Sequence, residues 1–180
     1  MMNILEFIEK YVTIIDKKTR KKSKFYPSDL QRCLLLAWEN APMSFDSSRQ
    51  TGMTTALVAK MAYDIINNEK DEFNIAHVNH SLSAAKVVMD ALKGVLDEYP
   101  EPIKIIRMSQ KNMTLQYKGH IIKVSVMTRP ENFVGNRFDA IYIDNFTYIK
   151  NYDALKMAFI PCMKPEKDGK NKVYEVSTAE

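Results

Sequence analysis

The sequence predicts an α/β fold, in which helices cover both faces of a mainly parallel β-sheet. Short apolar runs such as "FNIAHVN" and "AIYIDNF" alternate along the chain with longer stretches of helical spacing, and this alternation is typical of β-α-β units. The length of 180 residues, with 46% hydrophobic and 27% charged residues, suits one domain that buries a substantial core. Apart from one basic run, the chain contains no internal repeat and no low-complexity tract.

The elements of the first half follow from helical spacing and turn residues. Apolar residues from Ile4 to Ile15 recur at helical spacing and predict an amphipathic helix. A basic linker follows, and Ser28 or Asp29 is then placed to cap a second helix, "LQRCLLLAWEN". The segment "PMSFDS" predicts a short strand, and "MTTALVAKMAYDIINNE" predicts a long helix directly after Gly52.

In the second half, strands and helices continue to alternate. We expect a strand at "FNIAHVN", a helix at "SLSAAKVVMDALKGVLDEY" capped by Ser81 or Ser83, and a strand at "PIKIIRMS". The segment "MTLQYKGHIIKVSVMT" predicts a hairpin that turns at Lys118-Gly119. A strand at "AIYIDNF", a helix at "NYDALKMAFIPCM" and a final strand at "VYEVST" complete the pattern.

Composition excludes several classes of protein. No apolar run reaches the length of a membrane span. The N-terminal segment carries Glu6, Glu9 and Asp16, which a signal peptide would not. The two cysteines, Cys33 and Cys162, have no partner at metal-ligand spacing and fit a reducing compartment. We therefore expect a cytoplasmic protein that does not contact a membrane.

One polar turn has the composition of a phosphate-binding loop. The stretch "SSRQTGMTT" (residues 47–55) lies between a predicted strand and a long predicted helix, where backbone amides and the helix N-terminus can hold an anion. A P-loop ends in Gly-Lys-Ser/Thr, whereas this turn has Gly52-Met53-Thr54. Turns before helices often carry the same residue types, so the stretch alone does not establish a nucleotide site.

A second segment strengthens the nucleotide hypothesis. In "AIYIDNF", four apolar residues precede Asp144, as in a Walker B strand, whose aspartate holds Mg²⁺ opposite the P-loop hydroxyl. Thr54 would supply that hydroxyl. A buried parallel strand that ends in an acid is common, but the pair in this order, about ninety residues apart in an alternating α/β pattern, is much less so.

Together these segments resemble the ATPase domain of the large terminase subunit, the DNA-packaging motor of tailed bacteriophages. The resemblance runs from about Leu30 to the C-terminus. The stretch "SRQTGMTT" is similar to the family's P-loop, typically Ser-Arg-Gln-x-Gly-Lys-Thr-Thr. "IAHVNHSLSAAKVVMDALKGVL" is similar to the strand and helix that follow it, and "GNRFDAIYIDNFTYIKN" to the loop and Walker B strand. "VYEVST" falls where the family's coupling segment begins.

The resemblance implies a P-loop NTPase-like, RecA-like core with ATP and Mg²⁺ as ligands. Residues 1–26 would be an N-terminal helix and basic linker, and residues 27–180 the ATPase core, ending before the family's lid and nuclease domains. Gln31 stands where the family places a glutamine that recognises adenine. The implied nucleotide-binding positions are Gln31, Ser48, Arg49, Gln50, Thr51, Gly52, Met53, Thr54 and Thr55. The implied metal-binding positions are Thr54 and Asp144.

Two departures from the family's pattern fall on its catalytic positions. Met53 stands where the family has the P-loop lysine, and Asn145 where it has the Walker B glutamate, the general base. A methionine donates no hydrogen bond to phosphate, and an asparagine cannot accept a proton near neutral pH. Arg49, which matches the family's trigger arginine, is retained. We therefore expect a pocket that binds ATP weakly and hydrolyses it poorly.

The basic run "KKTRKKSK" packs six basic residues into eight positions. A solvated linker is the ordinary interpretation of such a run, and contact with DNA phosphates is the functional one. The candidate DNA contacts are Lys17, Lys18, Arg20, Lys21, Lys22 and Lys24.

Three functions remain open on the sequence alone. In the first, the chain is a hydrolysis-deficient, terminase-like protein that acts in the host cytoplasm as a decoy or regulator, by binding the viral packaging proteins (terminase or portal), nucleotide or DNA. In the second, it is the genuine ATPase domain of a packaging terminase. In the third, it is an α/β interaction module that binds no nucleotide.

Overall fold

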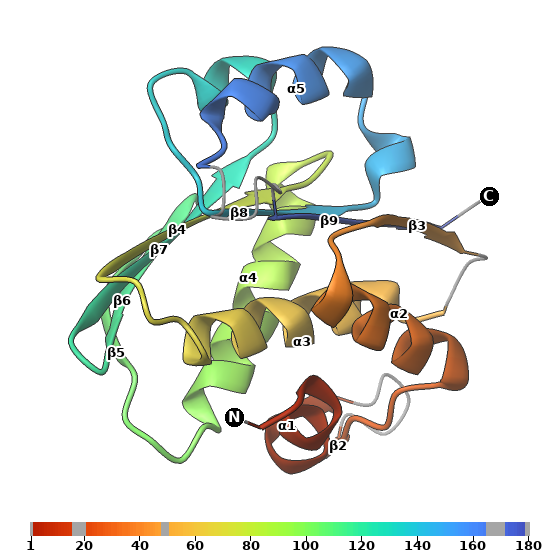
Figure 1. Ribbon diagram of the computed structural model, residues 1–180, viewed down its shortest axis with the longest axis vertical. Helices are drawn as coiled ribbons and strands as arrows, with labels where there is room; N and C mark the ends of the chain where they lie inside the picture. The colour runs from red at the N-terminus through yellow and green to blue at the C-terminus, as the bar shows by residue number, and fades with distance from the viewer. Residues whose placement is uncertain (1, 16–20, 48–50, 165–171, 179–180) are drawn as a thin grey trace.

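The computed structural model describes residues 2–15, 21–47, 51–164 and 172–178. Its main strands are β3 (Ser44–Ser47), β4 (Glu72–Val78), β5 (Lys104–Met108), β6 (Asn112–Tyr117), β7 (His120–Met127), β8 (Ala140–Asp144) and β9 (Lys172–Thr178). They form one sheet in the order β3-β9-β8-β4-β7-β6-β5 (Figure 1). The last strand along the chain therefore lies inside the sheet, between the first and the sixth of these strands.

The sheet is parallel from β3 to β7 and antiparallel beyond. β9 pairs in parallel with β3 and β8, and β4 pairs in parallel with β8 and β7. β6 pairs antiparallel with both β7 and β5. Every residue of β8 is buried, as expected for a parallel strand covered on both faces. The predicted α/β fold with a mainly parallel sheet is confirmed.

The predicted hairpin is present as β6 and β7. Tyr117 pairs with His120, and Lys118 and Gly119 between them have φ values of 50° and 88°. Two consecutive residues with positive φ are what a two-residue type I′ turn requires. The turn residues thus fix the register of the antiparallel half of the sheet.

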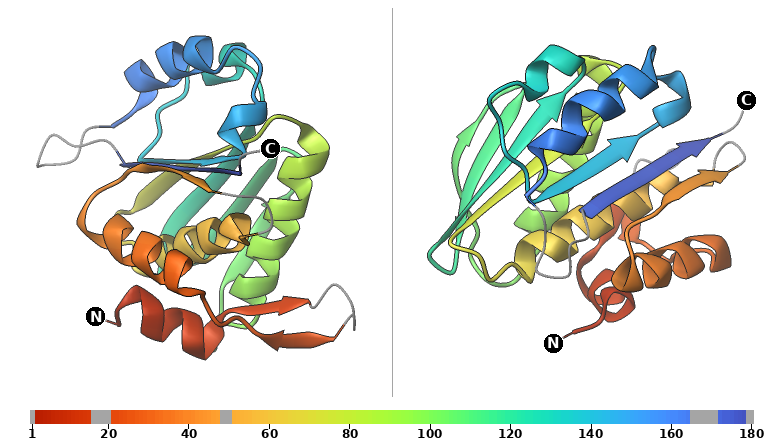
Figure 2. Two further views of the ribbon diagram at one scale, coloured as in Figure 1. Left: turned by 90° about the vertical axis from the view of Figure 1, so that its right-hand side faces the viewer. Right: turned by 45° about the horizontal axis from the view of Figure 1, so that its top comes forward.

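Helices lie on both sides of the sheet (Figures 1 and 2). On one side are α1 (Ile4–Tyr11), α2 (Asp29–Asn40), α3 (Met53–Ile66) and α4 (Leu82–Asp97), and on the other is α5 (Tyr152–Phe159). Tyr142 of β8 belongs to the larger core, whereas Ile141 and Ile143 belong to the smaller core with Phe159, as the alternation of a strand dictates. No helix in the described part of the chain is long and apolar enough to cross a membrane.

The N-terminal segment differs from the expectation in two respects. Helix α1 ends at Tyr11 rather than near Ile15, and β1 (Thr13–Ile15) follows it. β1 pairs antiparallel with β2 (Lys22–Lys24), a segment expected to be linker. The helix was expected to run too far because its apolar spacing continues to Ile15, whereas consecutive β-branched residues at 13–15 favour a strand. β2 was missed because its three polar residues form a strand only by pairing with β1. The division of the chain at residue 26 stays a prediction.

Candidate functional site

The predicted phosphate-binding turn and the end of β8 meet at the carboxyl edge of the parallel strands. Thr54, in the first turn of α3, donates a hydrogen bond from Oγ1 to Oδ1 of Asp144 over 2.9 Å. The two residues are 90 positions apart in the sequence. Open α/β sheets bind ligands at this edge. The structure therefore brings together the two residues at which a metal site is predicted.

Gly52 gives the turn its shape. It caps α3 with φ 68° and ψ 25°, a left-handed conformation that glycine adopts without strain. A Cβ at this position would lie 2.6 Å from Nε2 of Gln31, so a larger residue would also displace the Gln31 side chain. The backbone N–H groups and the dipole at the start of α3 favour an anion at this turn.

Gln31 joins helix α2 to the turn. Its Nε2 donates to the backbone oxygen of Thr51 over 2.7 Å, and its Oε1 accepts from the backbone N–H of Ser28 over 2.8 Å. Ser28 is the N-cap of α2 and forms a capping box with Gln31, so the helix start expected at Ser28 or Asp29 is at Ser28. Contact with adenine stays a prediction.

Asp144 is buried and accepts hydrogen bonds from three side chains. Besides Thr54, Nδ2 of Asn79 (3.2 Å) and Nδ2 of Asn145 (3.0 Å) both donate to its Oδ2. Burial raises the pKa of Asp144, while the three hydrogen bonds and the charge of His80 oppose that rise. The carboxylate is thus compensated by dipoles of the protein itself.

Asn79 is a site residue that the sequence interpretation missed. It is fully buried directly after β4, and β4 is a parallel neighbour of β8. The signal was available, because a polar residue that ends a parallel strand lies at the same edge of the sheet as the ends of its neighbours.

The other predicted site residues differ in burial, and three of them lie outside the described residues. Met53 is 2% exposed and packs in the larger core. Asn145 has a left-handed backbone, with φ 55°, which asparagine tolerates better than most residues. Thr51 and Thr55 are half-buried. Ser48, Arg49 and Gln50 lie outside the described residues.

Lys60, farther along α3, serves the core and not the site. It is 4% exposed and pairs with Asp64, which also accepts a hydrogen bond from the hydroxyl of Tyr142. Its Nζ lies 4.6 Å from the ring centroid of Tyr174. Removing this cation from its carboxylate and aromatic partners would leave a buried charge unpaired, so Lys60 does not replace the missing lysine at position 53.

The donor set at Thr54 and Asp144 fits Mg²⁺ in kind. A hydroxyl and a carboxylate are the hard oxygen ligands that Mg²⁺ prefers, usually together with waters and substrate phosphates. Among the described residues, no three His, Cys, Asp or Glu side chains gather as a metal-binding group. These two residues would therefore hold the ion only together with nucleotide or water oxygens.

The described part of the basic run, residues 21–24, includes strand β2, which pairs with β1. Lys22 pairs with Glu98 at the end of α4, and Nζ of Lys24 donates to the backbone oxygen of Lys10. Lys21, Lys22 and Lys24 are exposed. Lys17, Lys18 and Arg20 lie outside the described residues. Lys22 and Lys24 are thus engaged within the protein, and DNA binding stays a prediction.

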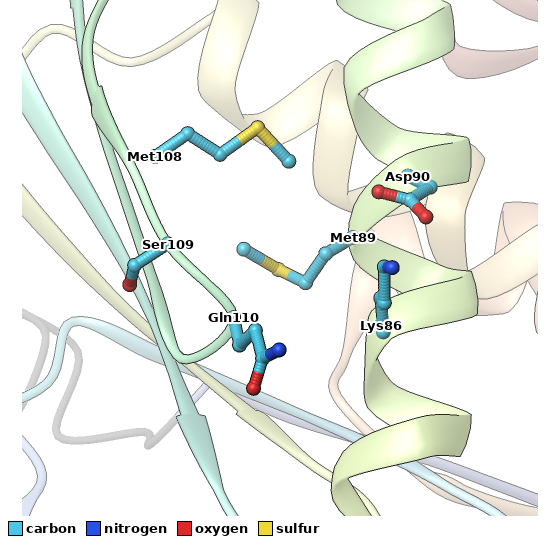
Figure 3. A pocket seen from close by; sticks show the side chains of 6 residues that line it. All are labelled: Lys86, Met89, Asp90, Met108, Ser109 and Gln110. Atoms are coloured by element: carbon cyan, nitrogen blue, oxygen red, sulfur yellow. The ribbon is translucent and has the colours of Figure 1, made fainter.

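A separate cavity of about 180 Å³ lies between α4 and the end of β5 (Figure 3). Met89 and Met108 extend into it from the two elements, and Lys86, Asp90, Ser109 and Gln110 line its rim. Those four residues are exposed, so the cavity offers a ligand no buried polar group. It adds nothing to the site at Asp144.

Comparisons with solved structures identify the fold. The large terminase of bacteriophage HK97 matches 99% of this chain with a TM-score of 0.72 and 13% identity. The large terminase of the thermophilic bacteriophage D6E matches 85% of the chain (TM-score 0.65, 17% identity). The ATPase domain of the Thermus phage P74-26 large terminase matches 87% (TM-score 0.64, 12% identity). No family model and no curated protein matches the sequence.

The chain spans only part of these proteins. It covers 37% of the HK97 terminase and 39% of the D6E terminase, but 66% of the P74-26 ATPase domain. The D6E terminase has also been solved in complex with ADP and with ATP-γ-S. This chain therefore has the P-loop NTPase-like fold of the ATPase domains of bacteriophage large terminases.

Proposed function

We propose that the chain is a terminase-like nucleotide-binding protein that has lost efficient hydrolysis and acts by binding. The hydrogen bond between Thr54 and Asp144 carries this proposal, because a P-loop hydroxyl and a Walker B aspartate are the pair that holds Mg²⁺ beside the phosphates in P-loop NTPases. Backbone amides at the start of α3 would hold the phosphates themselves. When bound, Mg²⁺ supplies positive charge that neutralises them.

The loss of hydrolysis rests on two side chains. Met53 is buried in the core and has no N–H to donate, and losing one such transition-state donor costs about a hundred- to a thousandfold in rate. Asn145 donates its amide to Asp144 and cannot take a proton from water. The absence of a general base removes roughly two to four further decades if the effects are independent.

The proposed partners are proteins of a viral packaging motor in the host cytoplasm. The neighbours in structure are large terminases, and a chain with their fold but without their catalytic side chains could occupy a terminase's place as a decoy or regulator. Co-purification with a terminase or portal protein from infected cells would support this role. The alternative, a working ATPase domain, is favoured by the intact Thr54–Asp144 pair, but it needs a cation that neither Met53 nor Lys60 provides.

Calorimetry with ATP-γ-S and Mg²⁺ tests the proposed nucleotide site. A missing charge-assisted hydrogen bond weakens binding about ten- to a hundredfold, so we expect a dissociation constant between high micromolar and millimolar. Thr54→Ala and Asp144→Ala should each abolish the heat of binding. Thr114→Ala, on β6, serves as the control and should leave it unchanged. If saturating nucleotide gives neither heat nor a shift in melting temperature, the chain is an interaction module without nucleotide.

A further inference from the structure

We propose that Asn145 competes with Mg²⁺ for Asp144, so that this asparagine sets the metal affinity of the pocket. The inference rests on the proposed nucleotide site and deepens it. It assigns to Asn145 a binding role in place of the general-base role that a glutamate would have at this position.

Both oxygens of the Asp144 carboxylate are engaged by the protein. Oδ1 accepts from Thr54 over 2.9 Å, and Oδ2 accepts from Asn79 and Asn145 over 3.2 and 3.0 Å. The residue is 3% exposed, so solvent satisfies little of its remaining capacity. Oδ2 therefore has both of its lone pairs occupied, and a metal ion that binds this oxygen has to displace one of its two donors.

Asn145 is the donor that a metal would displace. Asn79 is fully buried behind the carboxylate, and Thr54 can offer its own oxygen to the ion while still donating its proton. Asn145 is only half-buried, and it presents N–H groups, which repel a cation. It is thus more accessible than Asn79, the other donor to Oδ2, and is the donor least compatible with a metal at that oxygen.

The substitutions at positions 53 and 145, where the chain departs from the terminase pattern, are consistent with each other. Met53, which packs in the core, supplies no cation to compensate the buried Asp144. Asn145, held in a left-handed conformation (φ 55°, ψ 50°), turns its amide onto the preceding carboxylate. A glutamate there would instead place a second negative charge beside the first, which is unfavourable in a buried pair.

Titration with Mn²⁺, followed by the electron paramagnetic resonance signal of the free ion, tests the proposal with and without ATP-γ-S. Asn145→Gly keeps the left-handed backbone and removes the amide, and Asn145→Ala is the second variant. Because a net hydrogen bond is weak, we expect either variant to bind Mn²⁺ roughly three- to tenfold more tightly than the unaltered chain. Asn151→Gly is the matched control, since Asn151 has nearly the same backbone conformation (φ 57°, ψ 45°) and is exposed.

The outcomes separate this inference from the proposed function. If both Asn145 variants bind Mn²⁺ no more tightly than the unaltered chain, or more weakly, the competition does not exist and Asn145 is neutral or a ligand. If no variant binds Mn²⁺ under either condition, the inference also fails. If ATP-γ-S does not bind, the proposed nucleotide site fails, while the titration without nucleotide still decides the role of Asn145.

Discussion

Met53 and Asn145 are the residues at which nucleotide turnover would be lost or regained. The double variant Met53→Lys with Asn145→Glu restores the side chains of the terminase pattern. We expect phosphate release from ATP to rise at least about a hundredfold, which is the contribution of the transition-state donor before that of the general base is added. The single variant Met53→Lys should be less stable than the parent without nucleotide, because position 53 is buried and an unpaired charge there is costly. Robust turnover by the unaltered chain would contradict the loss of hydrolysis.

His77 predicts an acid-sensitive stability. It is fully buried in β4, and burial lowers its pKa from 6.5 to about 4. The ring of His77 therefore takes up a proton more readily in the unfolded chain than in the folded one. Above pH 6.5 the ring is neutral in both states and the folded protein has its full stability. As the pH falls from 6.5 toward 4, protonation of the unfolded chain lowers the free energy of unfolding. We expect a loss of roughly 3 kcal/mol from this residue over that interval, measured by urea unfolding.

The comparison that isolates His77 is between two variants. His77→Leu should unfold with a shallower pH dependence than the parent between pH 4 and 6.5. Val124→Ala lowers stability at a buried position of β7, the strand beside β4, without changing a titratable group, and should retain the parent's slope. Equal slopes in the parent and His77→Leu would rule out the buried neutral histidine as the cause.

At the scale of elements, the sequence was informative where local patterns determine structure. The helix starts at Ser28 and Ser81 and the turn at Lys118-Gly119 depend on residues within one turn of each other, and they were predicted. β1 and β2 were not, because a strand of three residues has too short a pattern to distinguish it from the end of a helix.

The same distinction holds for the site. Thr54 and Asp144 belong to segments with recognisable spacing, and their proximity was predicted from it. The hydrogen bonds that Asn79 and Gln31 make depend on which elements lie side by side, although the place of Asn79 directly after a predicted strand was a usable signal. Asn79 reaches Asp144 because β4 lies beside β8, and Gln31 reaches Thr51 because α2 packs against the turn. Strand order and helix packing, which a sequence motif does not encode, therefore determine these two contacts.

The β1–β2 hairpin is the element on which DNA binding can be tested. Replacing Lys17, Lys18, Arg20 and Lys21 by glutamine leaves the contacts of Lys22 and Lys24 in place. If the run contacts DNA, gel shifts should show that the variant no longer binds at low salt. Binding by the parent should fall steeply between about 50 and 200 mM salt, because phosphate contacts release counterions.

A matched control separates this element from net charge. Replacing Lys104, Arg107, Lys111 and Lys123 by glutamine removes the same charge from the antiparallel end of the sheet. If this variant loses DNA binding as completely as the hairpin variant, the affinity comes from overall charge. If the parent itself does not bind at low salt, the run is a solvated surface segment.

For the molecule as a whole, β9 is the strand that joins β3 to the rest of the sheet. β9 lies between β3 and β8, so β3 has no pairing partner without it. Its Glu175 is buried, accepts a hydrogen bond from the hydroxyl of Ser44, and lies 3.7 Å from Nζ of Lys156. The strand thereby joins β3, near the beginning of the core, to α5 on the opposite face.

We therefore expect that deleting residues 172–180 abolishes cooperative folding. The larger core would lose Tyr174 and Val176, each worth about 1.5 to 3 kcal/mol by burial, together with the hydrogen bonds to β3 and β8. Such a loss is a large part of the 5 to 15 kcal/mol that typically stabilises a domain.

The milder change Val176→Ala should lower the free energy of unfolding by roughly 2 kcal/mol in urea unfolding, and Val173→Ala, at a half-buried position of the same strand, should lower it less. A shortened chain that melts cooperatively at the parent's temperature would show that the sheet closes without β9.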